Sequence, residues 1–310
     1  MPAAPDCWYL AGPTASGKTR VAMELARRLD AEIVSMDSMA IYRGMDIGTA
    51  KPSAELRAAW PHHLIDVVDP TEDYSLSQYL DAAHAAIAEI RQRGRDVLFV
   101  GGTPLYLKSM LRGLFHGPPA DWEFRRAVEA EVEQVGLEAL HARLQQVDPL
   151  LADKLHPNDK RRIIRALEVY RVTGEPLSHL QREFEEGRGA EQCRVFVLQW
   201  PRDVLHRRIE LRVEDMFQRG LVDEVEGLLR NYGQLGRTAT QAVGYREVLE
   251  MLGGKRDLAS TIDQVKAGTR QFARRQETWF RGLSECRFLA MDDDESPESL
   301  ADRIVASADH

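Results

Sequence analysis

Short apolar runs alternate with helix-like spacing over about the first hundred residues. Four runs have the length of buried strands: CWYLA, EIVSM, HLIDVV and DVLFV, which begin at residues 7, 32, 63 and 96. Between the first two, Val21, Leu25 and Leu29 recur at the spacing of one helix face. Strands that alternate with helices predict a parallel sheet covered on both faces, with ligands bound beyond the carboxyl ends of the strands.

The pattern changes near Pro118. From there to about Cys193 the spacing is helical, with breaks at Gly136, Pro149, Pro157 and Gly174. RVFVLQW then restores a strand, and a long helix is expected from about Asp257 to Arg281. The simplest organisation is an α/β core formed by residues 1–118 and 195–310, with an all-helical subdomain inserted at residues 119–194.

GPTASGKT, residues 12–19, stands between the first strand and the first helix. Its glycines let backbone N–H groups point into one concavity, and a helix N-terminus favours anions. Lys18 adds a mobile positive charge, and the Thr19 hydroxyl is a typical ligand of Mg²⁺. The core is therefore expected to be P-loop NTPase-like, with a polyphosphate site lined by Gly12, Pro13, Thr14, Ala15, Ser16, Gly17, Lys18 and Thr19.

The motif does not identify the polyphosphate. An NTPase also needs a strand that ends in an acidic residue to hold the metal, but DVLFV leads into GGTPLY without a carboxylate. This absence disfavours ATP hydrolysis.

Polar side chains follow two further strands. Asp37 and Ser38 come after the second strand, and Thr103 comes after the fourth. The carboxylate could bind Mg²⁺, act as a general base or cap the turn, whereas Thr103 could cap the helix that begins at Pro104 and also donate to a ligand. Because these strands end at one edge of the predicted sheet, we expect both positions to converge with the glycine loop.

The net charge of −8 argues weakly against a nucleic-acid partner, but local patches can override it. One basic cluster contains Lys160, Arg161, Arg162 and Arg165, and another contains Lys266, Arg270, Arg274 and Arg275. Lys266, Arg270 and Arg274 are four residues apart and so share one helix face. The three cysteines lack zinc or disulfide spacing, and we see neither a secretion signal nor a membrane span, which favours a cytoplasmic protein.

Six segments, in order and over essentially the whole chain, resemble the bacterial tRNA dimethylallyltransferases. They are GPTASGKT, DSMAIYRGMDIGTAKP, GGTPLYLKSMLRGL, HPNDKRRIIRALEVYRVTG, AVGYRE and TRQFARRQETWFR. The resemblance implies transfer of a dimethylallyl group from dimethylallyl diphosphate, with Mg²⁺, to the N6 amine of the adenosine immediately 3′ of the anticodon, in tRNAs that read codons beginning with U. The glycine loop would then hold the donor's diphosphate. Asp37 would be the general base, Thr103 would touch the reacting centre or a diphosphate oxygen, and Lys18 would contact the diphosphate. Arg219 would either contact the diphosphate as well or form a surface salt bridge.

The resemblance also implies a tRNA surface. We expect a monomer, because a large RNA would fill the site, and no membrane partner, because no apolar window reaches the length of a membrane span. The insertion would hold the anticodon stem or loop, and the basic helix would follow the stem phosphates. The implied contacts are Asp37, Ser38, Met39, Ala40, Thr103, Arg125, Arg161, Arg162, Ile163, Ile164, Arg165, Gly244, Arg246, Lys266, Arg270 and Arg274. The family often has glutamine at the positions of Ala40 and Arg161, and loss of the amide at position 40 removes a possible contact to a base edge.

Two other functions fit parts of the sequence. A P-loop small-molecule kinase would share the core, bind its acceptor near Asp37 and consume ATP; the helical insertion, the basic clusters and the missing acid disfavour it. A non-catalytic RNA-binding or GTPase-like module would need a guanine-recognition signal such as N-K-x-D, which the chain lacks.

Overall fold

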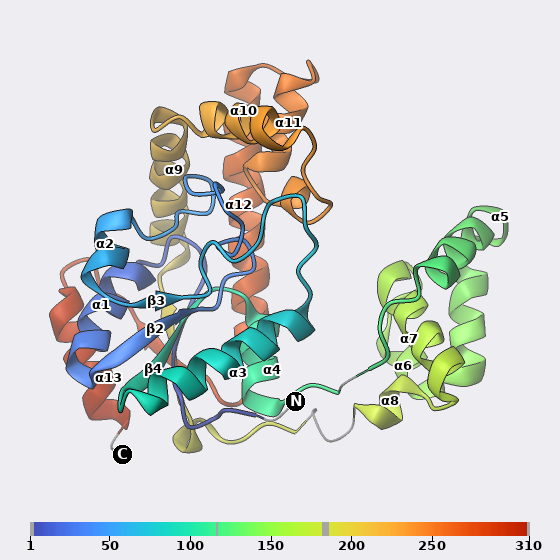
Figure 1. The fold of residues 1–310 in the computed structure, drawn as a ribbon, viewed down its shortest axis with the longest axis horizontal. Coiled ribbons are helices and arrows are strands. Elements are labelled where there is room, and N and C mark those ends of the chain that lie inside the picture. The colour runs from blue at the N-terminus through green and yellow to red at the C-terminus, as the bar shows by residue number, and fades with distance from the viewer. Residues whose placement is uncertain (1–2, 116, 182–185, 309–310) are drawn as a thin grey trace. The chain divides into compact units, whose positions relative to one another are not determined.

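The computed structural model describes residues 3–115, 117–181 and 186–308. The chain divides into two compact units (Figure 1). The larger unit comprises residues 4–111 and 187–310, and the smaller comprises residues 112–186 together with residues 1–3. Within the described ranges, no helix combines the length and apolar composition that a membrane span requires.

Six parallel strands form the sheet of the larger unit, which confirms the predicted α/β class. Their spatial order is β3 (His62–His63), β2 (Ala31–Ser35), β4 (Asp96–Gly101), β1 (Trp8–Ala11), β5 (Arg194–Gln199) and β6 (Arg287–Ala290). Because β4 lies between β1 and β2, the carboxyl ends of these three strands are neighbours.

Helices cover the sheet because strand side chains alternate between its two faces. Leu10 and Phe196 join one apolar cluster with α1 (Lys18–Leu29) and α13 (Pro297–Ala308). Tyr9, the neighbour of Leu10, points to the opposite face and stacks on Phe99 with ring centroids 5.1 Å apart. Helix α3 (Leu76–Gln92) packs against β2 and β4.

Further helices extend the larger unit. They are α2 (Ala54–Ala59), α4 (Pro104–Arg112), α9 (Arg202–Gln218), α10 (Leu221–Tyr232), α11 (Tyr245–Leu252) and α12 (Leu258–Arg281), with short 3₁₀ turns η2 (Ala190–Gln192) and η3 (Ala239–Gln241). Helix α12 is the predicted long helix, and the Asp257 side chain caps it by accepting a hydrogen bond from Ser260 N at 2.8 Å. It packs along α9, and both helices border the glycine loop through an apolar cluster that includes Ala15.

Two parts of the sheet differ from the prediction. The run HLIDVV was expected to be a full strand, but β3 ends at His63 because Leu64 and Asp66 adopt positive φ angles of 59° and 56°. Val68 pairs instead with Tyr42 as an isolated bridge. Strand β6 and helix α13 were not predicted, because the segment that contains them is rich in charged residues.

The smaller unit, as far as it is described, is helical. It contains α5 (Trp122–Val147), α6 (Pro149–Lys154), α7 (Lys160–Thr173) and α8 (Leu177–Leu180). Helix α5 is interrupted at Gly136, and it packs against α6 and α7 around an apolar core. This unit spans residues 112–186, whereas the sequence analysis placed the insertion at residues 119–194.

A buried carboxylate fixes the start of β2. Glu32 is 3% exposed and accepts hydrogen bonds from Arg93 Nη2 at 2.7 Å and from His63 Nε2 at 2.6 Å. The hydrogen bonds from Arg93 and His63 outweigh burial and lower the pKa of Glu32 from 4.5 to about 2. The ionised carboxylate is therefore part of the folded structure.

We expect this carboxylate to make folding stability depend on acid. Since its pKa is depressed, the stabilisation is complete above about pH 4.5 and is lost as the pH falls towards about 2. The pKa shift of Glu32 corresponds to about 3 kcal/mol of unfolding free energy. Because Arg93 is partly exposed, solvent screening should reduce this contribution to about 1–2 kcal/mol. Urea unfolding of the wild type and Glu32→Gln at several pH values measures it, with the exposed Glu89→Gln as control. A Glu32 contribution that does not change across this pH range would contradict the prediction.

Candidate active site

The neighbouring carboxyl ends of β1, β4 and β2 carry the glycine loop, Thr103 and Asp37. Thr103 N donates a hydrogen bond to Met36 O at 3.2 Å. Its Oγ1 accepts a hydrogen bond from Ser38 N at 3.1 Å. The hydroxyl therefore joins the loop that contains Asp37, as well as standing at the start of α4.

Two side chains hold the glycine loop by its carbonyl groups. Arg208 Nε donates to Ala15 O, and Trp200 Nε1 donates to Ser16 O, both at 3.0 Å. Arg208 also lies over the Trp200 ring, 4.3 Å from its centroid. With these carbonyls engaged, the N–H groups of the first turn of α1 have no helical acceptor and can bind an anion.

Lys18 is turned back onto its own loop. Its Nζ donates hydrogen bonds to Gly12 O at 2.9 Å and to Pro13 O at 2.7 Å. Burial and the charge of Arg212 lower the pKa of Lys18 to about 7, and Asp37 acts in the opposite direction. A polyanion bound at the loop would favour the charged form of the Lys18 ammonium, because opposite charges attract.

Arg212 on α9 is a candidate that the sequence analysis missed. Its Nε is buried and has no hydrogen-bond partner among the described residues. Burial lowers the pKa of its guanidinium, whereas Asp37 and Asp215 raise it. Arg212 therefore lies within electrostatic reach of both Lys18 and Asp37. In the sequence, Arg212 could have been noticed only as a charged residue beside the apolar face of α9, which contains Ile209.

Asp37 is half-buried, and one of its oxygens has a turn-capping role. Oδ1 accepts a hydrogen bond from Met39 N at 2.8 Å, which fixes the carboxylate against its own backbone. Its charge also acts on Lys18 and Arg212. Capping occupies one oxygen and leaves Oδ2 for a second role.

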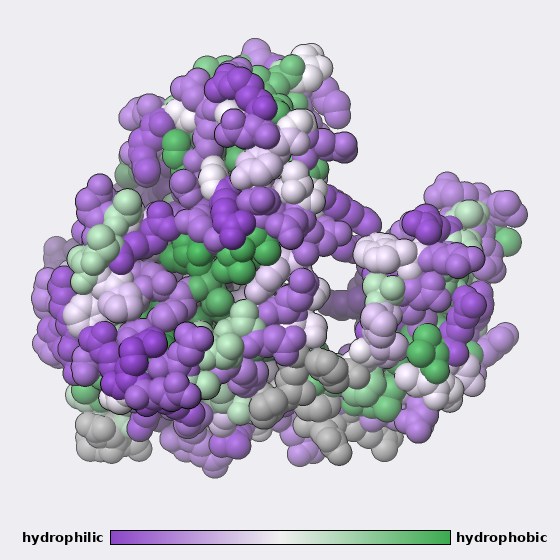
Figure 2. Space-filling view, in the orientation of Figure 1, coloured by the Kyte–Doolittle hydropathy of each residue, from purple (hydrophilic) through white to green (hydrophobic). Residues whose placement is uncertain are grey.

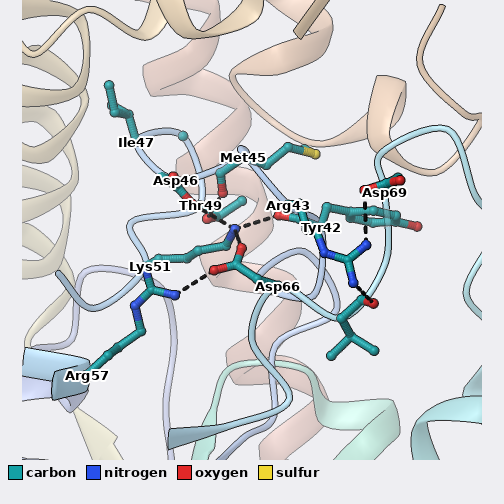
Figure 3. Close-up of polar contacts among 12 residues, drawn as sticks. Tyr42, Arg43, Met45, Asp46, Ile47, Thr49, Lys51, Arg57, Asp66 and Asp69 are labelled. Carbon is teal, nitrogen blue, oxygen red and sulfur yellow. Dashed lines mark hydrogen bonds and ion pairs between the residues drawn. The ribbon is translucent and has the colours of Figure 1, made fainter. Parts of the chain in front are cut away.

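The rest of the Asp37 loop is organised by a buried lysine (Figure 3). The Lys51 side chain is 1% exposed, and its Nζ donates to Asp66 Oδ1 at 2.6 Å, Asp46 Oδ1 at 2.8 Å and Tyr42 O at 2.5 Å. Arg57 Nη1 donates to the other oxygen of Asp66 at 2.5 Å. These contacts tie the loop after β2 to the segment after β3.

Apolar side chains gather over the same loops. Figure 2 shows them on the larger unit, where Figure 1 places the segments that follow β2 and β3. Met39, Val67 and Val68 are among the partly buried apolar residues packed there. A ligand at this site would therefore meet apolar surface beside the charged loop.

Two of the basic side chains on α12 that were expected to contact RNA are already engaged in ion pairs. Lys266 Nζ pairs with Glu214 at 2.6 Å and Arg270 Nη1 pairs with Glu210 at 2.9 Å, so α9 neutralises two of the three predicted cations. Arg274 is exposed and has no ion pair with any residue that the structure describes.

Arg219, for which the sequence left a diphosphate contact or a surface salt bridge open, forms a surface ion pair in this structure. Its side chain is 57% exposed and pairs with Asp215 on the same helix at 3.5 Å. Such a pair needs no ligand to explain it.

In the smaller unit, two predicted RNA contacts are held by one buried carboxylate. Glu168 is fully buried and accepts hydrogen bonds from Arg125 Nη2 at 2.8 Å and Arg165 Nη1 at 2.5 Å. Burial would raise the pKa of Glu168, but these two guanidinium groups outweigh it and lower the pKa. Arg161 and Arg162 are exposed beside them on α7.

Four other predicted contacts, Ala40, Ile163, Ile164 and Gly244, are buried. Ile163 and Ile164 belong to the core of the smaller unit, because helix periodicity turns them away from Arg161. Ala40 is 5% exposed, and its carbonyl accepts a hydrogen bond from Asp66 N. Gly244 is also buried, whereas its neighbour Arg246 is exposed and pairs with Glu247.

The described side chains do not form a complete metal site of their own. No three His, Cys, Asp or Glu residues within the described ranges are grouped as metal ligands.

The similarity to known proteins extends over both units of the chain. A family model described as IPP transferase matches residues 40–283. A tRNA dimethylallyltransferase of Rhodopirellula baltica is 49% identical, over 98% of this chain and 96% of its own, and one of Halorhodospira halophila is 50% identical, over 91% and 92%. The structure of a full-length tRNA isopentenylpyrophosphate transferase of Bacillus halodurans has a TM-score of 0.70, with 38% identity over 99% of this chain and 97% of its own. A eukaryotic dimethylallyltransferase acting on tRNA has a TM-score of 0.78, with 27% identity over 97% and 77%.

Proposed function

The chain belongs to the IPP transferase family, the tRNA dimethylallyltransferases, and on that premise we propose how its side chains carry out the reaction. The enzyme transfers a dimethylallyl group from dimethylallyl diphosphate to the N6 amine of the adenosine immediately 3′ of the anticodon in tRNA. We further propose that its substrates are tRNAs that read codons beginning with U.

One observation supports the assignment of the glycine loop as the binding site for dimethylallyl diphosphate. Lys18 and Arg212 are two cations at the glycine loop, and burial lowers the pKa of each. The positive charges of Lys18 and Arg212 repel each other, whereas the negative charge of Asp37 attracts both. A bound diphosphate would compensate these charges, and the apolar surface beside the loop suits the dimethylallyl tail.

The reaction exchanges one bond for another. The N6 nitrogen attacks C1 of the dimethylallyl group, the bond from C1 to the diphosphate oxygen breaks, and its electron pair leaves on that oxygen. One proton of the amine passes to Oδ2 of Asp37, so the product is a neutral secondary amine. The amine is a weak nucleophile because its lone pair is delocalised into the ring, and a base that removes the proton as the bond forms lowers the barrier.

The leaving diphosphate gains negative charge as the bond breaks. The backbone N–H groups at the start of α1, Lys18 and Arg212 would stabilise this charge, because they are held in place before the reaction begins. Thr103, whose hydroxyl is held by Ser38 N, would contact the amine or a diphosphate oxygen. Thr19 and the diphosphate oxygens would hold Mg²⁺, which neutralises charge on the leaving group.

We assign the RNA side to exposed cations of both units. Arg274 and Arg246 belong to the larger unit, and Arg161 and Arg162 belong to the smaller. Arg125 and Arg165 keep a fixed geometry through Glu168, and Lys266 and Arg270 would have to leave their carboxylate partners to contact phosphate. Ser38 and Met39 are half-buried beside Asp37, where the target base would arrive.

Arg274→Gln is expected to weaken tRNA binding and to lower the slope of log affinity against log salt by about 0.7–1, because one phosphate contact is lost. Lys266→Gln should have a smaller effect, since its ammonium pairs with Glu214. Filter binding over a salt series measures both, with Arg27→Gln on α1 as control. An unchanged slope for Arg274→Gln would make this face of α12 an ordinary solvated surface.

The activity is tested with the purified protein, Mg²⁺, dimethylallyl diphosphate and an unmodified tRNA with adenosine 3′ of its anticodon. Mass spectrometry of the digested tRNA should find the adenosine heavier by one five-carbon prenyl group. Parallel reactions contain ATP in place of the isoprenoid, or a tRNA that reads codons beginning with another base. ATP consumption without prenylation would favour the hypothesis of a small-molecule kinase. Equal modification of all tRNAs would contradict the proposed preference for codons that begin with U.

We also propose that the protein acts as a monomer in the cytoplasm. Every side chain assigned to the chemistry lies in the larger unit of one chain, so no partner subunit is needed to complete the site. The tRNA substrate supports the cytoplasmic location.

A further inference from the structure

Gln276 lies on the buried side of α12, and its side-chain amide joins two loops of the site. The residue is 4% exposed. Its Oε1 accepts a hydrogen bond from Thr14 N in the glycine loop at 2.9 Å, and its Nε2 donates to Gly102 O after β4 at 2.6 Å. Both ends of the amide are therefore used, each on a different functional loop.

The hydrogen bonds continue beyond Gly102 towards the base. The next residue, Thr103, donates its N–H to Met36 O at 3.2 Å and accepts from Ser38 N at 3.1 Å through its hydroxyl. Asp37 lies between these two partners. A continuous path thus runs from the loop that would hold the diphosphate, through Gln276 and Thr103, to the carboxylate that would accept the proton.

The packing along this path leaves little space for adjustment. A Cβ atom at Gly102 would come within 2.5 Å of Gln276 Nε2, and one at Gly101 would come within 2.0 Å of Met36 O. Two glycines therefore allow the end of β4 to approach both the amide and the end of β2. A shift of one loop would be transmitted to the other through these contacts.

We propose that Gln276 is a positioning residue of the transferase: its amide sets the separation between the diphosphate loop and the Thr103–Asp37 side, so that the leaving group and the base face each other across the acceptor amine. This inference rests on the proposed function. Misplacement of reacting groups by about 1 Å can cost about 100-fold in rate. Because α12 also carries Arg274 on its exposed side, the same helix would link RNA contact to alignment of the donor.

Two substitutions separate the two hydrogen bonds. Gln276→Glu keeps an oxygen for Thr14 N but replaces the donor with a carboxylate oxygen that repels Gly102 O. Gln276→Met has a similar length and makes neither bond. The matched control is Gln264→Met, an exposed glutamine on another face of the same helix.

The measurement is the pre-steady-state burst of transfer, with both substrates saturating and in excess of the enzyme, together with tRNA affinity from filter binding. We expect rate constants about 10- to 100-fold lower for both Gln276 variants. Burst amplitude and tRNA affinity should match those of Gln264→Met. Rate constants equal to the control, or a loss of amplitude at an unchanged rate constant, would overturn the positioning role, because a merely structural amide would reduce only the folded, active fraction.

Deuterium exchange gives a readout that does not need catalysis. Peptides that cover residues 12–19 and 101–107 should both exchange faster in Gln276→Met than in Gln264→Met. If neither loop changes, the inference fails even when the wild type is active. If the wild type transfers no prenyl group, the proposed function fails, and the exchange result still decides whether Gln276 couples the two loops.

Discussion

Replacing Asp37 by asparagine is expected to lower the single-turnover rate constant of prenyl transfer by about 100- to 10,000-fold, because the amide cannot accept the proton of the attacking amine. The substitution is close to isosteric, and the asparagine oxygen can still accept the hydrogen bond from Met39 N that fixes the turn. The loop should therefore keep its shape. Rapid-quench transfer to labelled tRNA measures the rate constant, and filter binding measures tRNA affinity.

The two measurements distinguish chemistry from recognition. If Asp37 is the base, affinity should stay within about twofold of the wild type while the rate collapses. The exposed Asp73→Asn removes a carboxylate on another loop and serves as control. A fall in tRNA affinity that matches the fall in rate would move Asp37 from the chemistry to the RNA surface.

Arg212→Met should lower the transfer rate by about 100- to 1,000-fold, since it removes a preorganised charge from the leaving diphosphate. Arg212→Lys should recover part of this loss, because it keeps the charge but not the planar guanidinium. Affinity for dimethylallyl diphosphate should also fall, as measured by its concentration dependence in the same assay. Arg207→Met, an exposed arginine on the same helix, is the control.

The same experiment decides between Arg212 and Arg219. Arg219→Met should change the rate by less than about threefold, because an exposed ion pair contributes little. Its guanidinium pairs with Asp215 at the surface, whereas the Nε of Arg212 is buried without a hydrogen-bond partner among the described residues. A large effect at Arg219 with a small one at Arg212 would restore the assignment made from the sequence.

Local patterns in the sequence determined β1, β2, β4 and β5, the long helix and the phosphate loop. A strand followed by a glycine-rich turn and Lys18 is typical of a phosphate loop, because glycine permits the required angles and the helix that follows presents its N–H groups. Asp257 predicts the start of α12 for a similar reason, since its side chain caps its own helix. Asp37 and Thr103 could be placed at one edge of the sheet because the carboxyl ends of parallel strands share that edge.

Contacts between distant segments were decided by the tertiary structure alone. Arg212 is one charged residue among many on α9 until the fold brings it near Lys18. Nothing local distinguishes Gln276 from the exposed glutamines of α12, and its role depends on loops that arrive from β1 and β4. Arg165 belongs to a basic cluster in the sequence and Arg125 is an implied RNA contact, but Glu168 pairs with both. Backbone conformation and helix periodicity are set by neighbouring residues, whereas the charge and hydrogen-bond partners of a side chain are set by whatever the fold packs against it.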